Sequence, residues 1–429
     1  MTIHPQWPQA SINEIAEVNP GPSRPLVDEE LVSFVPMASV RELGGGIDAS
    51  TTRPTREVRR KSYRYFEEND VIMAKITPCF ENGKIAVARG LKSGRAFGST
   101  EFHVLRPRPA TVESAFLKYF LEGPAFRALA IQSMAGAVGQ LRVPTRVLAQ
   151  ATLPLPPLED QSRIVMALEA ILSLHASGVA NLSRARKRAT VLVGHILRSA
   201  VPIPGPSDWA TVSVQDAGIV TLGRQRAPKY HAGPKMRPYL RVANVFEDRI
   251  DARDVMQMHF EDDEFERYRL APGDVLLNEG QSPELLGRPA LYRGVPANVA
   301  FTNSLLRFQA KVGISPEWAL LVFRRHLHSG RFAKESRITT NIAHLSAGRF
   351  KTIEFPVPPL PEQQRIVDET AAQLDGLDTL VKGIEEAQKR AAQLRSAILA
   401  AAFTGRLPLE AQTGQARSVA TQELAGVAQ

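Results

Sequence analysis

A stretch of thirteen residues near the middle of the chain recurs near its end. LPLPPLEDQSRIV at residues 153–165 returns as FPVPPLPEQQRIV at residues 355–367, and eight of the thirteen positions are identical at a constant shift of 202. The same shift matches Trp7 with Trp209 and Ser11 with Ser213. Solenoids repeat roughly every 20 to 50 residues, so this period is that of a domain plus a connector. The chain is therefore predicted to contain two copies of one unit, able to bind two similar partners at a fixed distance.

The overall charge predicts a polyanionic partner. The chain has 53 basic and 44 acidic residues, a net charge of +9, which favours nucleic acid; a basic surface that serves only solubility is the alternative. The only cysteine is Cys79, which allows no disulfide within the chain and fits a reducing compartment. No secretory signal begins the sequence, and the longest helix-like apolar run is far shorter than the ~20 residues that span a bilayer. We expect a soluble, cytoplasmic protein without membrane contact.

Both halves show the same order of parts. Short apolar runs bounded by turn residues, such as residues 70–74 and 274–277, are typical of strands, and helical stretches are expected at residues 113–129 and 316–328. A proline-rich turn and a long helical pattern follow. The fold class is α+β, and the tail has the composition of a disordered segment. The predicted parts are a first strand-rich domain at 1–152, a first long helix at 153–200, a second strand-rich domain at 201–354, a second long helix at 355–406 and a disordered tail at 407–429.

The two long helices carry matching apolar stripes. Their apolar residues follow the alternating four- and three-residue spacing of a coiled-coil seam, once Thr370 fills a gap in the second copy. Two such helices in one chain can bury each other's stripes, which predicts an intramolecular antiparallel coiled coil of some 38 residues per helix. His175 falls on this seam as a structural histidine. The seam positions are Ile164, Leu168, Leu172, Val179, Leu182, Ala189, Leu192 and Ile196 in the first helix, and Ile366, Leu374, Leu377, Val381, Ile384, Ala391, Leu394 and Ile398 in the second.

Signatures of catalysis are missing from the sequence. It has no GxxxxGK[ST] phosphate loop and no Asn/Asp-Pro-Pro-aromatic run that would hold a flipped adenine. Asp274 and Glu279 only loosely resemble the carboxylate pair of a metal nuclease, because the expected lysine beside the second carboxylate is absent. We therefore predict a recognition or scaffolding role, with no catalytic residue, metal or cofactor in this chain.

Candidate DNA contacts fall into two groups. Basic clusters suit phosphate contacts, although each could also be a solvated charged loop; their members are Arg53, Arg56, Arg59 and Arg60 in the first half and Arg224, Arg226 and Lys229 in the second. Polar side chains in matched loops suit base readout, although each could equally cap its own loop. These candidates are Lys75, Thr77, Asn82, Lys84, Gln140 and Arg142 in the first half, and Asn278, Gln281, Arg288, Asn341 and His344 in the second.

Three features carry a resemblance to a known family across residues 1–407. They are the doubled turn PLPPLEDQ/PVPPLPEQQ before each long helix, the loop KITPCFENGK at residues 75–84 and the closing ILAAAFTGRL. The chain resembles the specificity (S) subunit of type I restriction-modification systems. The resemblance implies two target recognition domains related by pseudo-two-fold symmetry, each reading one half of a split double-stranded DNA target. It implies that the helices set the unread gap and dock two methyltransferase (M) subunits. Those carry S-adenosylmethionine and methylate adenine at N6, while restriction (R) subunits cleave DNA with ATP and Mg.

The two halves also differ in ways that affect this interpretation. An acidic run at residues 261–266 has no partner in the first half, so the two half-sites are expected to differ. Glu159 stands where the second copy has Pro361, which affects only how the first long helix begins. The competing hypothesis is a protein-interaction scaffold with two copies of a binding domain, which explains the repeat and the helices but not the charge.

Overall fold

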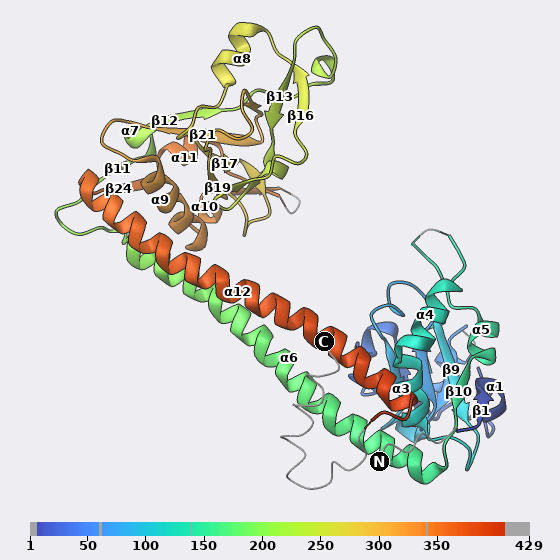
Figure 1. Cartoon of the computed structure of the whole chain (residues 1–429). Coiled ribbons are helices and arrows are strands. Elements are labelled where there is room, and N and C mark those ends of the chain that lie inside the picture. The colour runs from blue at the N-terminus through green and yellow to red at the C-terminus, as the bar shows by residue number, and fades with distance from the viewer. Residues whose placement is uncertain (1–6, 60–61, 138, 340–341, 408–429) are drawn as a thin grey trace. The chain divides into compact units, whose positions relative to one another are not determined.

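The computed structural model describes residues 7–59, 62–137, 139–339 and 342–407 (Figure 1). It divides into two compact units: unit 1 comprises residues 1–182 and 386–429, and unit 2 comprises residues 183–385. Each unit holds a mixed α/β globular part and a portion of each long helix, α6 (Leu158–Ala200) and α12 (Leu360–Phe403). Each compact unit therefore contains part of both long helices, and the domain boundaries expected from the sequence stay a prediction.

Unit 1 is built on two four-stranded sheets. All neighbours in the first sheet are antiparallel, whereas β3 and β8 in the second run parallel. The first sheet has the order β2 (Ala16–Val18), β9 (Phe102–Pro107), β6 (Val71–Ala74) and β7 (Ile85–Val87); the second has β4 (Thr52–Pro54), β3 (Leu31–Val35), β8 (Arg95–Gly98) and β5 (Arg64–Glu67). Around them lie β1 (Gln9–Ser11) paired with β10 (Thr152–Pro154), and the helices α1 (Ile12–Ile15), α2 (Thr55–Val58), α3 (Ser114–Glu122), α4 (Pro124–Gln132) and α5 (Thr145–Gln150).

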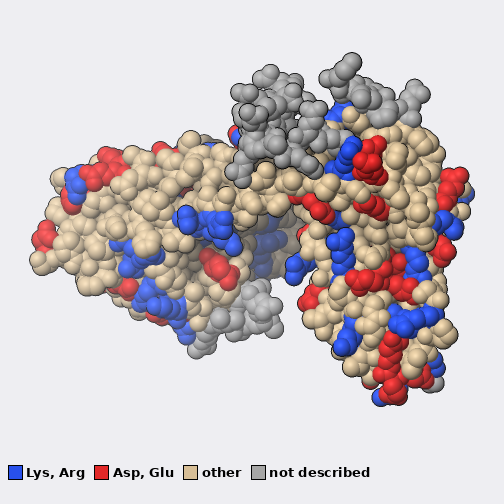
Figure 2. Space-filling model, turned by 90° about the horizontal axis from the view of Figure 1, so that it is seen from below, with Lys and Arg blue, Asp and Glu red and all other residues tan. Residues whose placement is uncertain are grey.

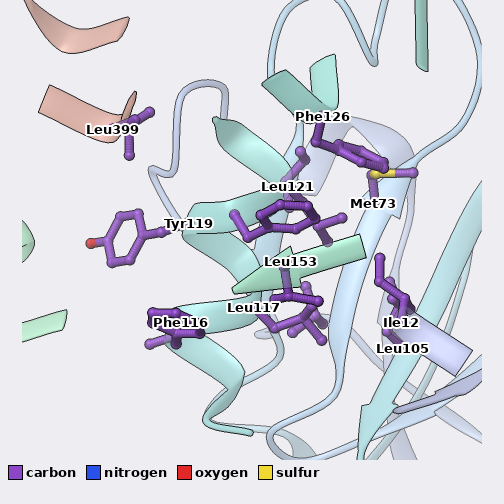
Figure 3. Close-up of a cluster of buried hydrophobic side chains, with 14 of the residues drawn as sticks. Ile12, Met73, Leu105, Phe116, Leu117, Tyr119, Leu121, Phe126, Leu153 and Leu399 are labelled. Carbon is purple, nitrogen blue, oxygen red and sulfur yellow. The ribbon is translucent and has the colours of Figure 1, made fainter. Parts of the chain in front are cut away.

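The core of unit 1 joins the first sheet to its helices and to both long helices. Figure 3 shows side chains from several elements converging on one cluster, among them Met73 of β6, Leu105 of β9 and Leu117 of α3. Phe116 of α3 packs 5.0 Å, between ring centres, from Phe403 at the end of α12. Burying these large apolar side chains supplies the main favourable term for folding this unit.

Unit 2 repeats this plan with different details. Its larger sheet has the order β12 (Gly218–Leu222), β21 (Leu305–Ala310), β17 (Val275–Asn278) and β19 (Pro289–Leu291), and a second sheet has β16 (Met256–His259), β13 (Met236–Leu240) and β20 (Ala300–Phe301). Smaller pairings join β11 (Ala210–Ser213) to β24 (Glu354–Val357), β14 (Val245–Phe246) to β15 (Arg249–Ile250), and β23 (Ile342–His344) to both β18 (Gly280–Gln281) and β22 (Arg337–Thr339). The helices are α7 (Val214–Ala217), α8 (Asp262–Tyr268), α9 (Pro316–His328), α10 (Arg331–Lys334) and α11 (Ala347–Lys351).

One helix predicted as continuous is broken in two in the structure. Residues 113–129 do not form one helix, because α3 ends at Glu122 and α4 begins at Pro124. The residue before a proline is pushed towards extended backbone, and Gly123 accordingly has φ −65° and ψ 149°. The matching helix of the second half, which has no internal proline, runs unbroken over the predicted residues as α9.

The long helices pair antiparallel in each unit. They have 43 and 44 residues, longer than the predicted 38. In unit 1, Ile164 and Leu168 of α6 share a core with Ile398 of α12, and His175 Nε2 lies 2.7 Å from the Ala391 carbonyl oxygen, which confirms its structural role. The other seam positions are buried or half-buried: Leu172, Val179 and Leu182 of α6 and Ile366, Thr370, Leu374, Leu377, Val381, Ile384, Ala391 and Leu394 of α12.

The predicted seam is wrong at Leu192 of α6, whereas the predicted Ile196 is half-buried. Leu192 is 46% exposed, while Val193 packs against the core of unit 2 and Leu197 is fully buried. The seam therefore steps by four residues from Ala189 to Val193 to Leu197. Of the described helices, α6 alone is long and apolar enough to cross a membrane, a test that core helices of soluble proteins also pass.

The same hydrogen-bond clamp fixes both proline-rich turns. Gln161, fully buried at the start of α6, accepts a bond from the Glu113 amide (2.9 Å) and donates to the carbonyls of Thr111 (3.2 Å) and Pro156 (2.9 Å). Gln363 at the start of α12 makes the same three bonds, to Ser315, Gly313 and Pro358. Every partner is displaced by 202 residues, so the repeated turn forms the same joint between a globular part and a long helix in each unit.

Candidate nucleic-acid interface

The basic stretch of unit 1 follows strand β4 into helix α2. The Arg53 guanidinium lies 4.2 Å from the centre of the Phe34 ring, Arg56 pairs with Glu29, and Arg59 pairs with Asp28 at 2.8 Å. The Arg56 side chain is 50% exposed, so its ion pair is worth little and can be exchanged for a phosphate. Arg60, the fourth member of the predicted cluster, lies outside the described residues.

Two predicted base-reading segments of unit 1 lie side by side. The Thr77 hydroxyl accepts from the Leu141 amide (3.1 Å), and the Val143 amide donates to the Lys75 carbonyl (2.8 Å), which joins residues 75–84 to the segment that carries Gln140 and Arg142. Arg142 holds Glu101 through two bonds of 3.0 Å, and Lys75 Nζ lies 3.8 Å from the same carboxylate. Burial lowers the pKa of Lys75, whereas the Arg142 bond lowers that of Glu101.

The other end of residues 75–84 is attached to a neighbouring turn. Asn82 donates to Glu42 Oε1 (2.9 Å), and Lys84 Nζ donates to the Met37 carbonyl (3.0 Å). Both side chains therefore bond to a different segment of the chain, and their contact with DNA stays a prediction. Sequence reasoning missed the half-buried Arg127, which holds this segment through the Phe80 and Glu81 carbonyls. Its only signal in the sequence is the lack of a charged counterpart at Ser329 in the second half.

Unit 2 brings together the corresponding loops. Gln281 in β18 pairs in register with Ala343 of β23, and His344 Nδ1 lies 3.2 Å from Glu279 Oε2. Arg288 donates to the Val245 carbonyl (2.6 Å), and burial lowers its pKa. The predicted candidate Asn341 lies outside the described residues.

Two predicted contacts of unit 2 are placed inside the protein. Asn278 is fully buried in β17, and its side-chain amide has no hydrogen-bond partner among the described residues. Arg224 is 5% exposed, pairs with Glu264 at 2.6 Å and lies 3.9 Å from the centre of the Tyr230 ring. Side chains this little exposed cannot touch a base or phosphate in this conformation, so neither residue belongs to the proposed interface.

The acidic run of the second half pairs with basic side chains of the same unit. This run forms α8, where Asp262 lies 2.8 Å from Lys235 and 3.4 Å from Arg237. Arg226 and Lys229 lie instead near aromatic rings, 5.6 Å from the centre of Tyr239 and 4.9 Å from that of Tyr230. Figure 2 shows the same mixing more widely, with basic and acidic side chains interspersed over the face in view. Net charge alone therefore does not locate an interface on this molecule.

The described residues contain no cluster of three or more His, Cys, Asp and Glu side chains that could hold a metal ion. The geometry just described is that of a surface assembled from loops, in which donors and acceptors of adjacent segments are fixed by mutual hydrogen bonds. Such a surface can recognise a partner through polar contacts.

Comparison with known families gives two matches along the chain. The model of the family described as type I restriction modification DNA specificity domain matches residues 6–178 and 206–392, well over half of the chain. The EcoAI type I restriction enzyme specificity subunit of Escherichia coli is 31% identical over 211 residues, 48% of this chain and 36% of that protein. The chain thus spans about a third of the length of this relative. The EcoKI specificity subunit of E. coli strain K12 is 22% identical over 315 residues, 71% of this chain and 68% of that protein.

Solved structures share the fold. A chain from a study of complex assembly and conformational transition of the type I R-M system superposes with a TM-score of 0.77 at 20% identity, covering 94% of this chain and 99% of that one. The HsdS subunit from Thermoanaerobacter tengcongensis gives a TM-score of 0.55 at 21% identity, covering 94% of this chain and 98% of its own.

Proposed function

Because the chain belongs to the type I restriction-modification DNA specificity family, we propose that it is the non-catalytic specificity subunit of such a system, reading a bipartite, asymmetric DNA target. The observation that carries this proposal is the repeated joint. Two α/β parts with different loop residues are attached to paired helices by the same buried glutamine clamp. Identical joints with unlike loops suit a protein that presents two different readers in equivalent positions.

The proposed readers are the loop surfaces of the two units. In unit 1, Lys75, Thr77, Gln140 and Arg142 are adjacent and supply donors and acceptors for base edges, while Arg53, Arg56 and Arg59 supply phosphate contacts. In unit 2 the corresponding residues are Gln281, Arg288 and His344 for bases and Arg226 and Lys229 for phosphates. Asn82 and Lys84 remain candidates that must exchange their present partners to reach DNA.

The proposed partners are protein subunits as well as DNA. Exposed apolar side chains are spread along the long helices, with Leu174 at 63% exposure in unit 1 and Val191 at 60% in unit 2, and such side chains suit docking of two M subunits. S-adenosylmethionine, ATP and Mg would then be held by M and R subunits, because this chain carries no motif for them. The same interpretation places the protein in the cytoplasm, with α6 covered by protein instead of lipid.

A salt titration separates DNA reading from the scaffold hypothesis. We expect the full chain to retard duplex DNA in a mobility-shift assay, with affinity falling steeply as salt rises because phosphate contacts release counterions. Binding to duplexes of random sequence that does not depend on salt, or no binding at all, would eliminate the DNA proposal. A matched variant with Arg53, Arg56 and Arg59 changed to Gln is expected to reduce the slope of log affinity against log salt by about 2–3.

A further inference from the structure

A buried ion-pair cluster lies at the contact between helix α3, helix α12 and the turn at residues 41–46. Glu122 of α3 has a side chain that is 3% exposed and lies 2.5 Å from Arg395 Nη2 of α12 and 3.2 Å from Lys118 Nζ. The same Arg395 nitrogen donates to the Leu43 carbonyl at 3.2 Å. One guanidinium therefore joins a long helix both to the globular part of unit 1 and to a surface turn.

The turn is held closely against this cluster. Gly44 has φ +80°, and a Cβ built on it would lie 3.0 Å from Glu122 Oε1 and from Lys118 Nζ. A side chain at this position would be strained in its backbone and would press on the ion pair. The glycine-rich turn is thus shaped to approach the charged cluster closely.

The turn in turn holds residues 75–84. The Leu43 amide donates to the Gly83 carbonyl (3.1 Å), and Glu42 accepts from Asn82 (2.9 Å). Gly83 has φ +70°, and its Cβ would meet the Leu43 side chain at 3.3 Å. A continuous set of hydrogen bonds therefore runs from Arg395 through Leu43 to the segment that carries the proposed base-reading residues.

In unit 2 an ion pair also holds the equivalent turn, but here the basic residue lies on the helix and the acidic residue on the turn. Residues 246–249 lie between the paired Val245 and Ile250, as residues 41–46 lie between the paired Val40 and Ile47, and Glu247 is on this turn. Arg324 corresponds to Glu122 at a shift of 202. Glu247 lies 2.8 Å from Arg324 and 3.0 Å from His328, both on α9. In unit 1, by contrast, the ion pair reaches the turn from α12.

We propose that Arg395 is a positioning residue for sequence readout by unit 1, setting the place of residues 75–84 through Glu122 and the turn at 41–46. The inference rests on the proposed DNA-reading function, because it assigns this segment to one half-site. Removing the guanidinium leaves Glu122 buried with one cation fewer and frees the Leu43 carbonyl, so the turn and the reading segment both lose their fixed position.

Hydrogen exchange on the full chain tests the structural part without DNA. In Arg395→Gln we expect peptides covering 41–46 and 80–85 to exchange at least tenfold faster, while peptides covering 245–250 stay unchanged. Arg390→Gln is the matched control, because Arg390 lies on the same helix and is exposed, with Glu386 at 3.8 Å. Unchanged exchange at 41–46 in Arg395→Gln overturns the proposal.

Selection from duplexes with random sequence tests the functional part. We expect Arg395→Gln to lose base preference in one half of the selected site, Glu247→Gln to lose it in the other half, and Arg395→Lys to keep both. A variant that was merely unstable would lower the bound fraction and leave the selected sequences intact, and this result would overturn the proposal, as would equal loss in both halves. Failure of the unaltered chain to select any bipartite sequence would instead overturn the proposed function, and this inference with it.

Discussion

At the residue scale, buried histidines and glutamines connect the elements of each unit. His103 donates to the Val143 carbonyl (2.8 Å) in unit 1, and His326 donates to the Glu354 carbonyl (2.9 Å) in unit 2. Burial lowers the pKa of both imidazoles, that of His326 to about 4. A neutral ring with its proton on Nε2 satisfies the carbonyl, whereas a second proton would place an unpaired charge in the core.

Protonation of His326 is expected to destabilise unit 2 in weak acid. Between its folded pKa of about 4 and the ordinary value of ~6.5, the unfolded chain binds a proton that the folded chain does not. The free energy of unfolding therefore falls as pH drops from ~6.5 towards 4, by up to about 3 kcal/mol, and this term is constant above ~6.5. Urea unfolding at pH 7 and pH 5 measures this fall in the free energy of unfolding. His326→Gln should show a smaller difference between the two pH values than the wild-type chain, while His231→Gln, at an exposed site, should keep the full difference.

The glutamine joints allow a second test at this scale. Gln161→Ala leaves the Glu113 amide and two carbonyls without their partner inside the protein, which should lower the free energy of unfolding by about 2–4 kcal/mol. Gln363→Ala should behave alike, because its three bonds are the same. Gln364→Ala, at the exposed neighbouring position, should change the free energy by no more than ~0.5 kcal/mol. Equal denaturation midpoints for Gln161→Ala and Gln364→Ala would refute the stabilising role of the Gln161 hydrogen bonds.

At the element scale, hydrophobic periodicity was the basis for predicting where the strands and the long helices lie. Strands and long helices were found where short apolar runs and the seam spacing placed them, because both patterns follow from which face of an element is buried. The break at Gly123 and the seam shift at Val193 are set by local backbone and by neighbours that the periodicity does not contain. The site was harder still: Arg224 looks like any other surface arginine in sequence, and only the fold shows Glu264 and Tyr230 beside it.

The two faces of α6 should respond differently to truncation. Leu168 is fully buried against α12 and the core of unit 1, so Leu168→Ala should lower the free energy of unfolding by about 3 kcal/mol. Leu174 is 63% exposed, and Leu174→Ala should leave stability within ~0.5 kcal/mol of the wild type. If this face docks an M subunit as proposed, Leu174→Ala should weaken co-purification with that subunit at unchanged denaturation midpoint. A large loss of stability in Leu174→Ala would contradict the assignment of Leu174 to the exposed face of α6.

At the scale of the whole molecule, the proposed function makes helix length a determinant of the target. Along the chain, α6 begins after the globular part of unit 1 and ends before that of unit 2, so under this proposal its length sets the gap between the half-sites. Deleting seven residues from each helix, 179–185 and 383–389, keeps the heptad seam in register and shortens each helix by about 10 Å. At ~3.4 Å per base step, the gap between half-sites should shrink by up to about three base pairs, with both half-site sequences unchanged. Methylation mapping in a host that carries the variant and its M partner measures gap and half-sites together. Altered half-site sequences at an unchanged gap would show that helix length does not set the spacing.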